Sequence, residues 1–263
     1  MPGTGLVPGL DVAGEVEAVA PDVTGFTQGD EVFGFAAGSL AQYAVADAAK
    51  LAPKPPDVTF PLAAAIPTAH LTSYQALAEH GKLAKGGKVL IIGASGGCGL
   101  SACQLASAMG ASEVVGVCSA ANVPLATSQG ATRCVDYNDK EAMDALLAEG
   151  KRYDLVYDAA TGSGQGENYV EFCEKVTGGR RVAINGGFGA WLGCFTGLQK
   201  ETNKLILTRQ NGEQLKEIVQ LMRKGSREPV VDSIHPLSAE GVDAAYSRLK
   251  SRRTRGKIIL TMT

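Results

Sequence analysis

A glycine-rich turn between two apolar strands constrains this chain more than any other feature. Residues 88–92 form a short apolar run typical of a strand buried on both faces, and residues 114–118 form a second. Between them lie the glycines of residues 93–99 and a segment, 100–109, whose apolar residues recur at helical spacing. Strand, glycine turn, helix and strand make one βαβ unit of about 30 residues. We therefore predict a parallel sheet whose first crossover begins at this turn.

The turn has the composition of a diphosphate-binding loop. Ala94, Gly96 and Gly99 occupy the three key positions of the Gly-x-Gly-x-x-Gly pattern. Gly96 allows close approach of a ligand, and Gly99 lets the helix pack against the strand. The start of the helix adds unpaired N–H groups and a partial positive charge of about half a unit. The pattern predicts dinucleotide binding, although Ala94 departs from the first glycine and leaves open a tight turn that holds no ligand.

The end of the second strand bears on which dinucleotide is bound. A site for NAD usually has Asp or Glu about 20 residues past the glycines, to bind the ribose 2′-hydroxyl. This chain has Cys118-Ser119-Ala120 there, and Glu113 lies at the other end of the strand. Without a carboxylate to repel it, a 2′-phosphate is tolerated and Ser119 can donate to it, which favours NADPH. The open alternative is that Ser119 caps the helix starting near Asn122.

Composition excludes several other classes of protein. The 263 residues are 45% hydrophobic and 20% charged, with a formal net charge of −2, so nothing favours nucleic acid or a membrane surface as the main partner. No apolar run approaches the roughly 20 residues of a membrane span. The six cysteines form no Cys-x-x-Cys pair and the three histidines lie far apart, so no zinc-ligand spacing is present. We expect free thiols in a reducing compartment.

The order of the predicted elements indicates an α/β protein with a second, β-rich part. Strands are expected at 11–20, 30–35 and 40–46, and again, beyond the first βαβ unit, at 133–137, 154–157, 181–184, 205–208, 229–236 and 257–262. Helices are expected over 63–79, with an interruption at Pro67, and over 123–129, 140–148, 168–176, 213–224 and 239–250. Alternating strands and helices predict a doubly wound parallel sheet. The glycines of 162–166 are interpreted as a plain loop.

Taken together, these motifs resemble the medium-chain dehydrogenase/reductase superfamily, in its zinc-independent branch of quinone oxidoreductases and enone or alkenal reductases. The resemblance covers essentially the whole chain. The motifs that carry it are Pro8–Val16, Phe26–Val32, Ala63–Pro67 with Leu71–Thr72, Gly93–Gly99, Val135–Tyr137, Tyr153–Asp158 and Arg255–Leu260. It implies a Rossmann-type doubly wound parallel sheet plus a partial GroES-like β domain. The domains would then be 1–62 (partial GroES-like), 63–228 (dinucleotide-binding) and 229–263 (a return to the first).

The resemblance also bears on metal and reaction. Zinc-dependent members of the superfamily carry Gly-His-Glu where this chain has Gly9-Leu10-Asp11, and Leu10 cannot ligate a metal. No metal is expected. Without a Lewis acid to stabilise an alkoxide, oxidation of simple alcohols is not expected. The resemblance implies hydride transfer from NADPH to a quinone or to the C=C of an α,β-unsaturated carbonyl. Enoyl-thioester reduction, or NADPH binding without catalysis, are the alternatives.

Roles for individual residues follow from the same resemblance. It places Thr72 near the nicotinamide, Ser95, Gly97 and Cys98 at the diphosphate, and Asn185 at the nicotinamide edge. Ser119 and Tyr137 would hold the 2′-phosphate, with Arg255 supplying a cation, since many relatives have Arg or Lys where this chain has Ala120. The predicted cofactor-binding residues are therefore Thr72, Ser95, Gly96, Gly97, Cys98, Gly99, Ser119, Tyr137, Asn185 and Arg255. A helix-turn hydroxyl at Thr72, a strand-end aromatic at Tyr137 and a solvated charge at Arg255 are the alternatives, and no catalytic proton donor is indicated.

The beginning of the chain departs from the family pattern. Members of the family have several dozen residues before the position of Met1, so a fragment or a minimal variant is expected. The first residues lack a basic region followed by an apolar core, so no signal peptide is expected. A cytoplasmic location is predicted, with an organelle as the alternative if a leading segment is missing. Homodimerisation is implied by the family alone.

Overall fold

The computed structural model describes residues 7–162 and 168–262, so most of the glycine loop at 162–166 lies outside the described residues. The chain divides into two compact units. Unit 1 consists of Met1–Leu71, Arg209–Gln220 and Glu228–Thr263, and unit 2 of Thr72–Thr208 and Leu221–Arg227. No helix among the described residues is long and apolar enough to cross a membrane.

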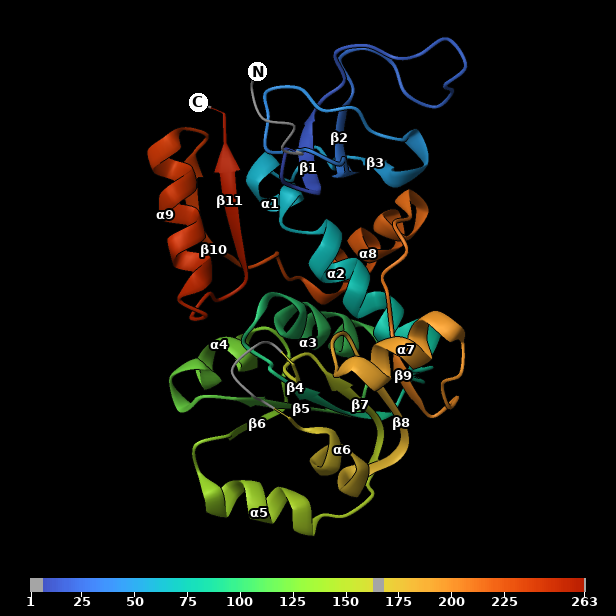
Figure 1. The fold of residues 1–263 in the computed structure, drawn as a ribbon, viewed down its shortest axis with the longest axis vertical. Helices are drawn as coiled ribbons and strands as arrows, with labels where there is room; N and C mark the ends of the chain where they lie inside the picture. The colour runs from blue at the N-terminus through green and yellow to red at the C-terminus, as the bar shows by residue number, and fades with distance from the viewer. Residues whose placement is uncertain (1–6, 163–167, 263) are drawn as a thin grey trace. The chain divides into compact units, whose positions relative to one another are not determined.

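Unit 2 contains a six-stranded parallel sheet (Figure 1). The strand order is β6-β5-β4-β7-β8-β9. The strands are β4 (Lys88–Ile92), β5 (Glu113–Cys118), β6 (Arg133–Asp136), β7 (Tyr153–Asp158), β8 (Thr177–Ala183) and β9 (Asn203–Leu205). This is the order of a Rossmann-type sheet, in which the strand order reverses between β4 and β7 and a ligand binds beyond the carboxyl ends of the strands. The predicted doubly wound parallel sheet is confirmed.

Helices cover both faces of this sheet. They are α3 (Gly97–Met109), α4 (Val123–Ser128), α5 (Lys140–Ala148), α6 (Val170–Val176) and α7 (Phe188–Thr196), with the short 3-10 turn η3 (Ala120–Asn122). In Figure 1, α3 lies on one face, and α5 and α6 lie on the opposite face. Since parallel strands joined by helices are buried on both sides, the central strands β4 and β5 are almost uninterrupted apolar runs, whereas β8 and β9 also carry polar residues.

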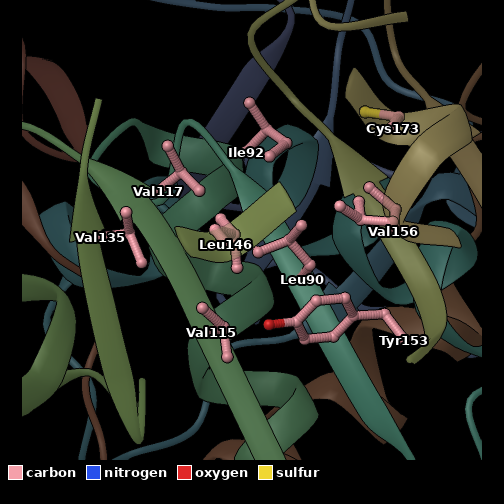
Figure 2. Packing of buried hydrophobic residues seen from close by; sticks show 10 residues of the cluster. Leu90, Ile92, Val115, Val117, Val135, Leu146, Tyr153, Val156 and Cys173 are labelled. Atoms are coloured by element: carbon pink, nitrogen blue, oxygen red, sulfur yellow. The ribbon is translucent and has the colours of Figure 1, made fainter. Parts of the chain in front are cut away.

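One face of the sheet forms a tightly packed core with α5 and α6 (Figure 2). Its buried members are Leu90, Ile92, Val115, Val117, Val135, Leu146, Tyr153, Val156, Cys173 and Val176. The only polar atom that Figure 2 shows among the labelled side chains, besides a sulfur, is the Tyr153 hydroxyl. That hydroxyl donates to Glu149 Oε2 at 2.9 Å, so the tyrosine is buried without an unpaired polar group.

Unit 1 combines segments from the two ends of the chain. Its antiparallel sheet has the order β1-β2-β3, and β10 pairs in parallel with β11. The elements are β1 (Asp11–Glu15), β2 (Glu31–Phe35), η1 (Ala48–Lys50), β3 (Leu51–Pro53), α1 (Phe60–Ala64), β10 (Val231–Pro236), α9 (Ala239–Lys250) and β11 (Lys257–Thr261). Asp11 joins these segments, because its carboxylate accepts from the Thr68 N–H at 3.1 Å and forms an ion pair with Lys257.

Two helices run from one unit into the other. They are α2 (Pro67–Tyr74), which is continued within unit 2 by the π-helical turn η2 (Gln75–His80), and α8 (Gly212–Gly225). The expected interruption at Pro67 is present, since α1 ends at Ala64 and α2 begins at Pro67. The expected boundaries between a GroES-like part and a dinucleotide-binding part, at 62 and 228, stay a prediction.

Several expected elements differ from the structure. No strand forms at 40–46, where Tyr43 and Val45 are 73% and 94% exposed, so the apolar residues of this pattern find no core to face. Strand β8 begins at Thr177, earlier than expected, because Gly178 and Gly179 let its backbone approach β7 closely. Helix α7 was not predicted at all.

Candidate functional site

The turn after β4 is fixed to the neighbouring strand. The N–H groups of Gly93 and Ala94 both donate to Val117 O, at 3.0 and 2.9 Å. Gly93 has a φ of +81°, which only glycine adopts readily. Ala94 is fully buried, and a Cβ built at Gly116 would lie 2.8 Å from the Ala94 Cβ. Ala94 therefore fills, in place of the first glycine, the space that Gly116 leaves on β5.

Two glycines of this turn have different steric surroundings. A Cβ at Gly99 would lie 2.7 Å from the Ala94 Cα, closer than real Cβ atoms come, so α3 can approach the turn only because Gly99 has no side chain. A Cβ at Gly96, by contrast, would have only Gly93 O within 4 Å among the described residues, at 3.6 Å. The packing of the protein does not demand glycine at Gly96. It leaves an open space beside the backbone that suits a bound diphosphate.

The first turn of α3 is held by hydroxyl groups. Ser73 Oγ donates to Cys98 O at 2.7 Å, and Ser101 Oγ donates to Gly97 O at 2.8 Å. The first N–H groups of a helix have no acceptor within the helix, and the helix dipole adds partial positive charge at that end. In this 13-residue helix they are presented at the turn beside Gly96, which is the arrangement that binds phosphate groups.

Ser95 and Asn122 meet at the same turn. The Asn122 amide Nδ2 donates to Ser95 Oγ at 3.1 Å. The Asn122 Oδ1 is buried and has no hydrogen-bond partner among the described residues. A buried acceptor without a donor is uncommon in a folded protein and calls for an explanation such as a ligand or water. A dinucleotide hydroxyl or a bridging water at this turn would satisfy it, so these residues fit such a ligand.

The structure brings Ser119 and Tyr137 together at the ends of β5 and β6. Tyr137 N donates to Cys118 O at 3.2 Å, and the Tyr137 side chain is 49% exposed. Ser119 is the N-cap residue of η3, yet its side chain makes no capping hydrogen bond. The Ser119 hydroxyl is therefore not used to cap η3, and about half of the Tyr137 side chain faces solvent. Their roles toward a ligand stay predictions.

One carboxylate near these strand ends escaped the sequence reasoning. Asp136 pairs in register with Cys118, and its Oδ1 accepts from the N–H of Asn138 at 2.9 Å. Hydrogen bonds from the Asn138 backbone and side-chain amides, and from the Ala120 backbone, lower the pKa of Asp136. Its charge is thus directed at the protein's own amides.

A buried ion pair organises the carboxyl ends of β7 and β8. Arg181 Nη2 donates to Asp158 Oδ2 at 2.5 Å, and the two side chains are 9% and 0% exposed. The other oxygen, Asp158 Oδ1, accepts from the N–H groups of Ala160 and Thr161 at 3.2 and 2.9 Å. Arg181 Nη1 also donates to Asn203 Oδ1 at 3.1 Å. One carboxylate therefore fixes the loop that follows β7, which lies against Gly93.

Thr72 and Asn185 also lie in unit 2. Thr72 is buried, and its hydroxyl is 2.6 Å from the Thr208 hydroxyl. Asn185 follows β8, where its Nδ2 donates to Gly162 O at 2.5 Å and its Oδ1 accepts from Gly186 N at 2.9 Å. Both side chains therefore have partners within the protein, and contact with a nicotinamide stays a prediction for each.

Arg255 is the one predicted cofactor residue that lies in unit 1. Its backbone N–H donates to Asp232 Oδ1 at 2.8 Å, and Asp232 also forms an ion pair with Arg248. Because Ser119 and Tyr137 lie in unit 2, the part of Arg255 in binding a 2′-phosphate stays a prediction. No group of three or more His, Cys, Asp or Glu side chains suited to a metal occurs within residues 7–162 and 168–262.

Sequence reasoning missed Ser73, Asn122 and Arg181. A signal was available for Arg181, because a charge inside an apolar strand requires a buried partner. Ser73 and Asn122 gave no such signal, since a serine and an asparagine are ordinary residues of helix ends and loops.

Comparison with known families matches both ends of the chain. Residues 1–56 match the family described as "Alcohol dehydrogenase GroES-like domain", and residues 129–260 match the family described as "Zinc-binding dehydrogenase". The second match covers half of the chain.

Individual proteins are similar over almost the whole chain. It is 34% identical over 265 residues to a "2-methylene-furan-3-one reductase" of Solanum lycopersicum, covering 97% of the chain and 63% of that protein. It is 32% identical over 269 residues to "Quinone-oxidoreductase QR1, chloroplastic" of Triphysaria versicolor, covering 97% and 79%. The chain thus spans less than two thirds of the length of the first of these relatives.

Solved structures show the same fold. The quinone oxidoreductase of Coxiella burnetii is 28% identical, with a TM-score of 0.80 over 97% of this chain and 79% of that one. A mycobacterial protein solved in complex with NADPH is 25% identical, with a TM-score of 0.76 over 97% and 82%. The chain belongs to the medium-chain dehydrogenase/reductase superfamily, in the branch that resembles quinone oxidoreductases and alkenal reductases.

Proposed function

We propose that this protein is an NADPH-dependent reductase that transfers a hydride to a quinone or to the C=C of an α,β-unsaturated carbonyl, without zinc. The observation that carries the proposal is the open space at Gly96, beside the first turn of α3 and the unpartnered Asn122 Oδ1. The diphosphate lies on the backbone of residues 96–99, where N–H groups and the helix dipole meet it. The names of the two curated relatives, a furanone reductase and a quinone oxidoreductase, support the choice of acceptor.

The preference for NADPH rests on the ends of β5 and β6. Ser119 has a hydroxyl that makes no capping bond, and Tyr137 is half exposed beside it. The carboxylate of Asp136, at the same level of the sheet, accepts from backbone N–H groups. A 2′-phosphate accepts hydrogen bonds from both hydroxyls. The carboxyl end of β5, which it faces, carries no carboxylate, since Glu113 lies at the other end of that strand.

The protein's part in the reaction is to position two reactants. The cofactor, when bound, supplies the hydride chemistry. The chain holds the diphosphate at the turn and keeps the loop after β7 in place through Asp158 and Arg181, so that the nicotinamide end has a fixed wall. Holding two reactants in register can lower a barrier by several kcal/mol. A quinone or conjugated enone is already activated and needs no metal, and Leu10 stands where zinc-dependent relatives have a metal-ligating histidine.

Two measurements on the purified chain test the proposal. NADPH fluorescence on titration with protein reports binding, and NADPH oxidation with a panel of quinones, short enals and crotonyl thioesters reports turnover. We expect binding, turnover with quinones or enals, and little with thioesters. Turnover with thioesters alone would indicate an enoyl-thioester reductase, and binding without turnover on any acceptor would indicate a non-catalytic protein. The cytoplasmic location and a homodimer remain predictions.

Replacement of Ser119 by Asp tests the choice of cofactor. Two like charges about 4 Å apart repel by about 1–4 kcal/mol, depending on the effective dielectric. We therefore expect Ser119→Asp to weaken NADPH binding about tenfold to a hundredfold and to leave NADH binding unchanged or stronger. Ser128→Asp adds the same charge at an exposed site on α4 and should change neither. Equal loss of both cofactors in Ser119→Asp would argue against a phosphate at this position.

A further inference from the structure

Helix α7 exposes the face that most helices bury. Its apolar residues Phe188, Trp191, Leu192 and Phe195 recur at positions i, i+3, i+4 and i+7, the spacing of one helix face. In a soluble protein such a face normally packs on the core, yet Phe188 is 85%, Leu192 52% and Phe195 71% exposed. No residue of α7 is buried. We call these four residues the α7 stripe.

The α7 stripe is preformed and free of charge. The rings of Trp191 and Phe195 are stacked, with centroids 5.9 Å apart and an interplanar angle of 26°. No Asp, Glu, Lys or Arg occurs between residues 182 and 199. An uncharged surface of this kind, rich in aromatic rings, suits apolar groups.

The position of the α7 stripe connects it with the proposed reaction centre. Helix α7 starts from its N-cap Gly187, which follows the loop 184–186 at the carboxyl end of β8. At that end of the sheet β8 pairs with β7 at Asp158. Ligands of this fold bind beyond these strand ends. From there the nine residues of α7 extend for about 13 Å at 1.5 Å per residue.

We propose that the α7 stripe binds the hydrocarbon tail of the acceptor, so that the preferred substrate is a quinone or enone with a long alkyl or prenyl substituent. The inference rests on the proposed function, because it takes the reactive head of the acceptor to lie at the carboxyl ends of β7 and β8. The tail then lies along the helix and covers Leu192 and Phe195. The head alone determines reactivity, and the tail adds affinity in proportion to its buried length.

The charges that flank the stripe favour a substrate tail over an anionic membrane. Adsorption to such a membrane relies on unpaired basic residues near the surface. Strand β8 precedes α7 and carries Arg180, and strand β9 follows α7 and carries Lys204. Both side chains are paired with Glu201, at 3.5 and 3.0 Å. With the exposed Lys200 these residues make three cations and one carboxylate, which is fewer basic residues than the cluster of about four to eight that recognises an anionic membrane.

A chain-length series tests the proposal by turnover. Alkyl-substituted benzoquinones, or alkenals, of increasing chain length are compared in NADPH oxidation. We expect kcat/KM to rise about twofold to fourfold per added methylene until the tail exceeds the helix, since one buried CH2 contributes at most about 0.8 kcal/mol. In the double variant Leu192→Ser with Phe195→Ser this rise should disappear, while kcat/KM for the shortest acceptor stays within about twofold. Both side chains are exposed, so the variant should fold normally.

Leu249→Ser is the matched control. Leu249 lies on α9 in unit 1 and is 56% exposed, close to the 52% of Leu192. This variant should keep the full dependence on chain length. The same loss in Leu249→Ser, or an equal loss for short and long acceptors in the double variant, would overturn the proposal.

The tryptophan gives a second readout that needs no turnover. Trp191 is the only tryptophan of the chain, so its fluorescence reports on the α7 stripe alone. With NADPH present, a saturated long-chain ketone such as undecanone should shift the emission to the blue, and butanone at the same concentration should not. In the single variant Leu192→Ser, which keeps the Trp191–Phe195 stack, the shift should weaken several-fold.

The two readouts separate this inference from the proposed function. A blue shift with undecanone but no turnover of any acceptor would contradict the proposed function and leave the apolar site in place. Turnover of short acceptors with no dependence on chain length would overturn the inference alone. Two further results would overturn it: binding to neutral or anionic lipid vesicles that the double variant loses, which would indicate a membrane, and a dimer that the double variant converts to monomer, which would indicate a second copy.

Discussion

Two loops at the carboxyl edge of the same sheet are built in opposite ways. The turn after β4 owes its shape to missing side chains, since Gly99 and Gly116 let α3 and Ala94 approach where any Cβ would collide. The loop after β7 owes its shape to a buried charge, because the Asp158 carboxylate forms an ion pair with Arg181 and accepts hydrogen bonds from two backbone N–H groups. A turn made of glycine adds no side chain to the ligand space, and a loop held by an ion pair resists movement. The difference shows how one sheet provides both an open cradle and a rigid wall.

Removal of the ion pair should have the largest effect. Arg181→Met leaves the Asp158 carboxylate buried without its cation, which typically costs about 3–5 kcal/mol. We expect the free energy of unfolding in urea to fall by that amount. Arg180→Met, at the neighbouring position, removes a partly exposed pair with Glu201 at 3.5 Å and an exposed hydrogen bond to the Glu201 carbonyl at 2.9 Å, and it should cost about 1 kcal/mol.

The double variant Asp158→Asn with Arg181→Met sharpens this result. It removes both charges, so it should recover a large part of the loss if the uncompensated charge is the cause. If Arg181→Met is no more harmful than Arg180→Met, the loop after β7 is not held by charge and the comparison between the two loops fails.

Alanine substitutions at Gly99 and Gly96, in the turn after β4, should affect stability and NADPH binding differently. Gly99→Ala forces a Cβ to within 2.7 Å of the Ala94 Cα, so we expect a loss of about 1–3 kcal/mol of stability together with weaker NADPH binding. Gly96→Ala meets nothing closer than 3.6 Å and should change stability by less than about 0.5 kcal/mol. Its NADPH affinity should nevertheless fall at least tenfold, because the methyl group occupies the space beside the diphosphate. Unchanged affinity in Gly96→Ala would place the cofactor elsewhere.

Cysteine labelling offers the gentlest test, because it changes no residue. Cys134 lies across Gly116 from Ala94, and hydrogen bonds from Cys118 and then Thr127 lower its pKa to about 7. Its thiolate forms above that pH, so the rate of reaction with iodoacetamide should rise with pH and level off above about 7. Cys173 is buried near the Asp158–Arg181 ion pair. Burial raises the pKa of its thiol to about 12, so Cys173 should stay unmodified until the protein unfolds.

Mass spectrometry of the labelled peptides at a series of pH values gives both rates. Thr127→Val removes a donor 3.8 Å from the Cys134 sulfur and should move the midpoint to higher pH. Equal labelling of Cys134 and Cys173 in the native protein would mean that the two regions do not differ in packing.

The contrast between these two loops also explains which features could be predicted from the sequence. The glycine turn is local, since Gly93, Gly96 and Gly99 lie within one turn of chain and their role depends on spacing alone. The central strands β4 and β5 were predictable for a similar reason, because a strand buried on both faces is an apolar run wherever it occurs. The fold class and the glycine turn were therefore accessible from the residues.

Features that depend on distant residues were not accessible. The pair of Asp158 and Arg181 joins residues 23 positions apart, and the pair of Ser73 and Cys98 joins residues 25 apart. Strand 40–46 was wrong because alternation predicts a strand only where a core receives its apolar side. Helix α7 was missed because Gly189 and Gly193, which are poor helix formers, interrupt a segment whose apolar residues do recur at helical spacing.

The assembly of unit 1 from both ends of the chain has a consequence for synthesis. A nascent polypeptide that has emerged from the ribosome as far as Thr208 already contains every strand of the six-stranded sheet. Its β1 carboxylate at Asp11 must meanwhile wait for Lys257, which is translated 246 residues later. The six-stranded sheet can therefore form first, while unit 1 must wait for the residues from Glu228 onward, so chaperones would meet this protein with one unit largely formed and the other still open.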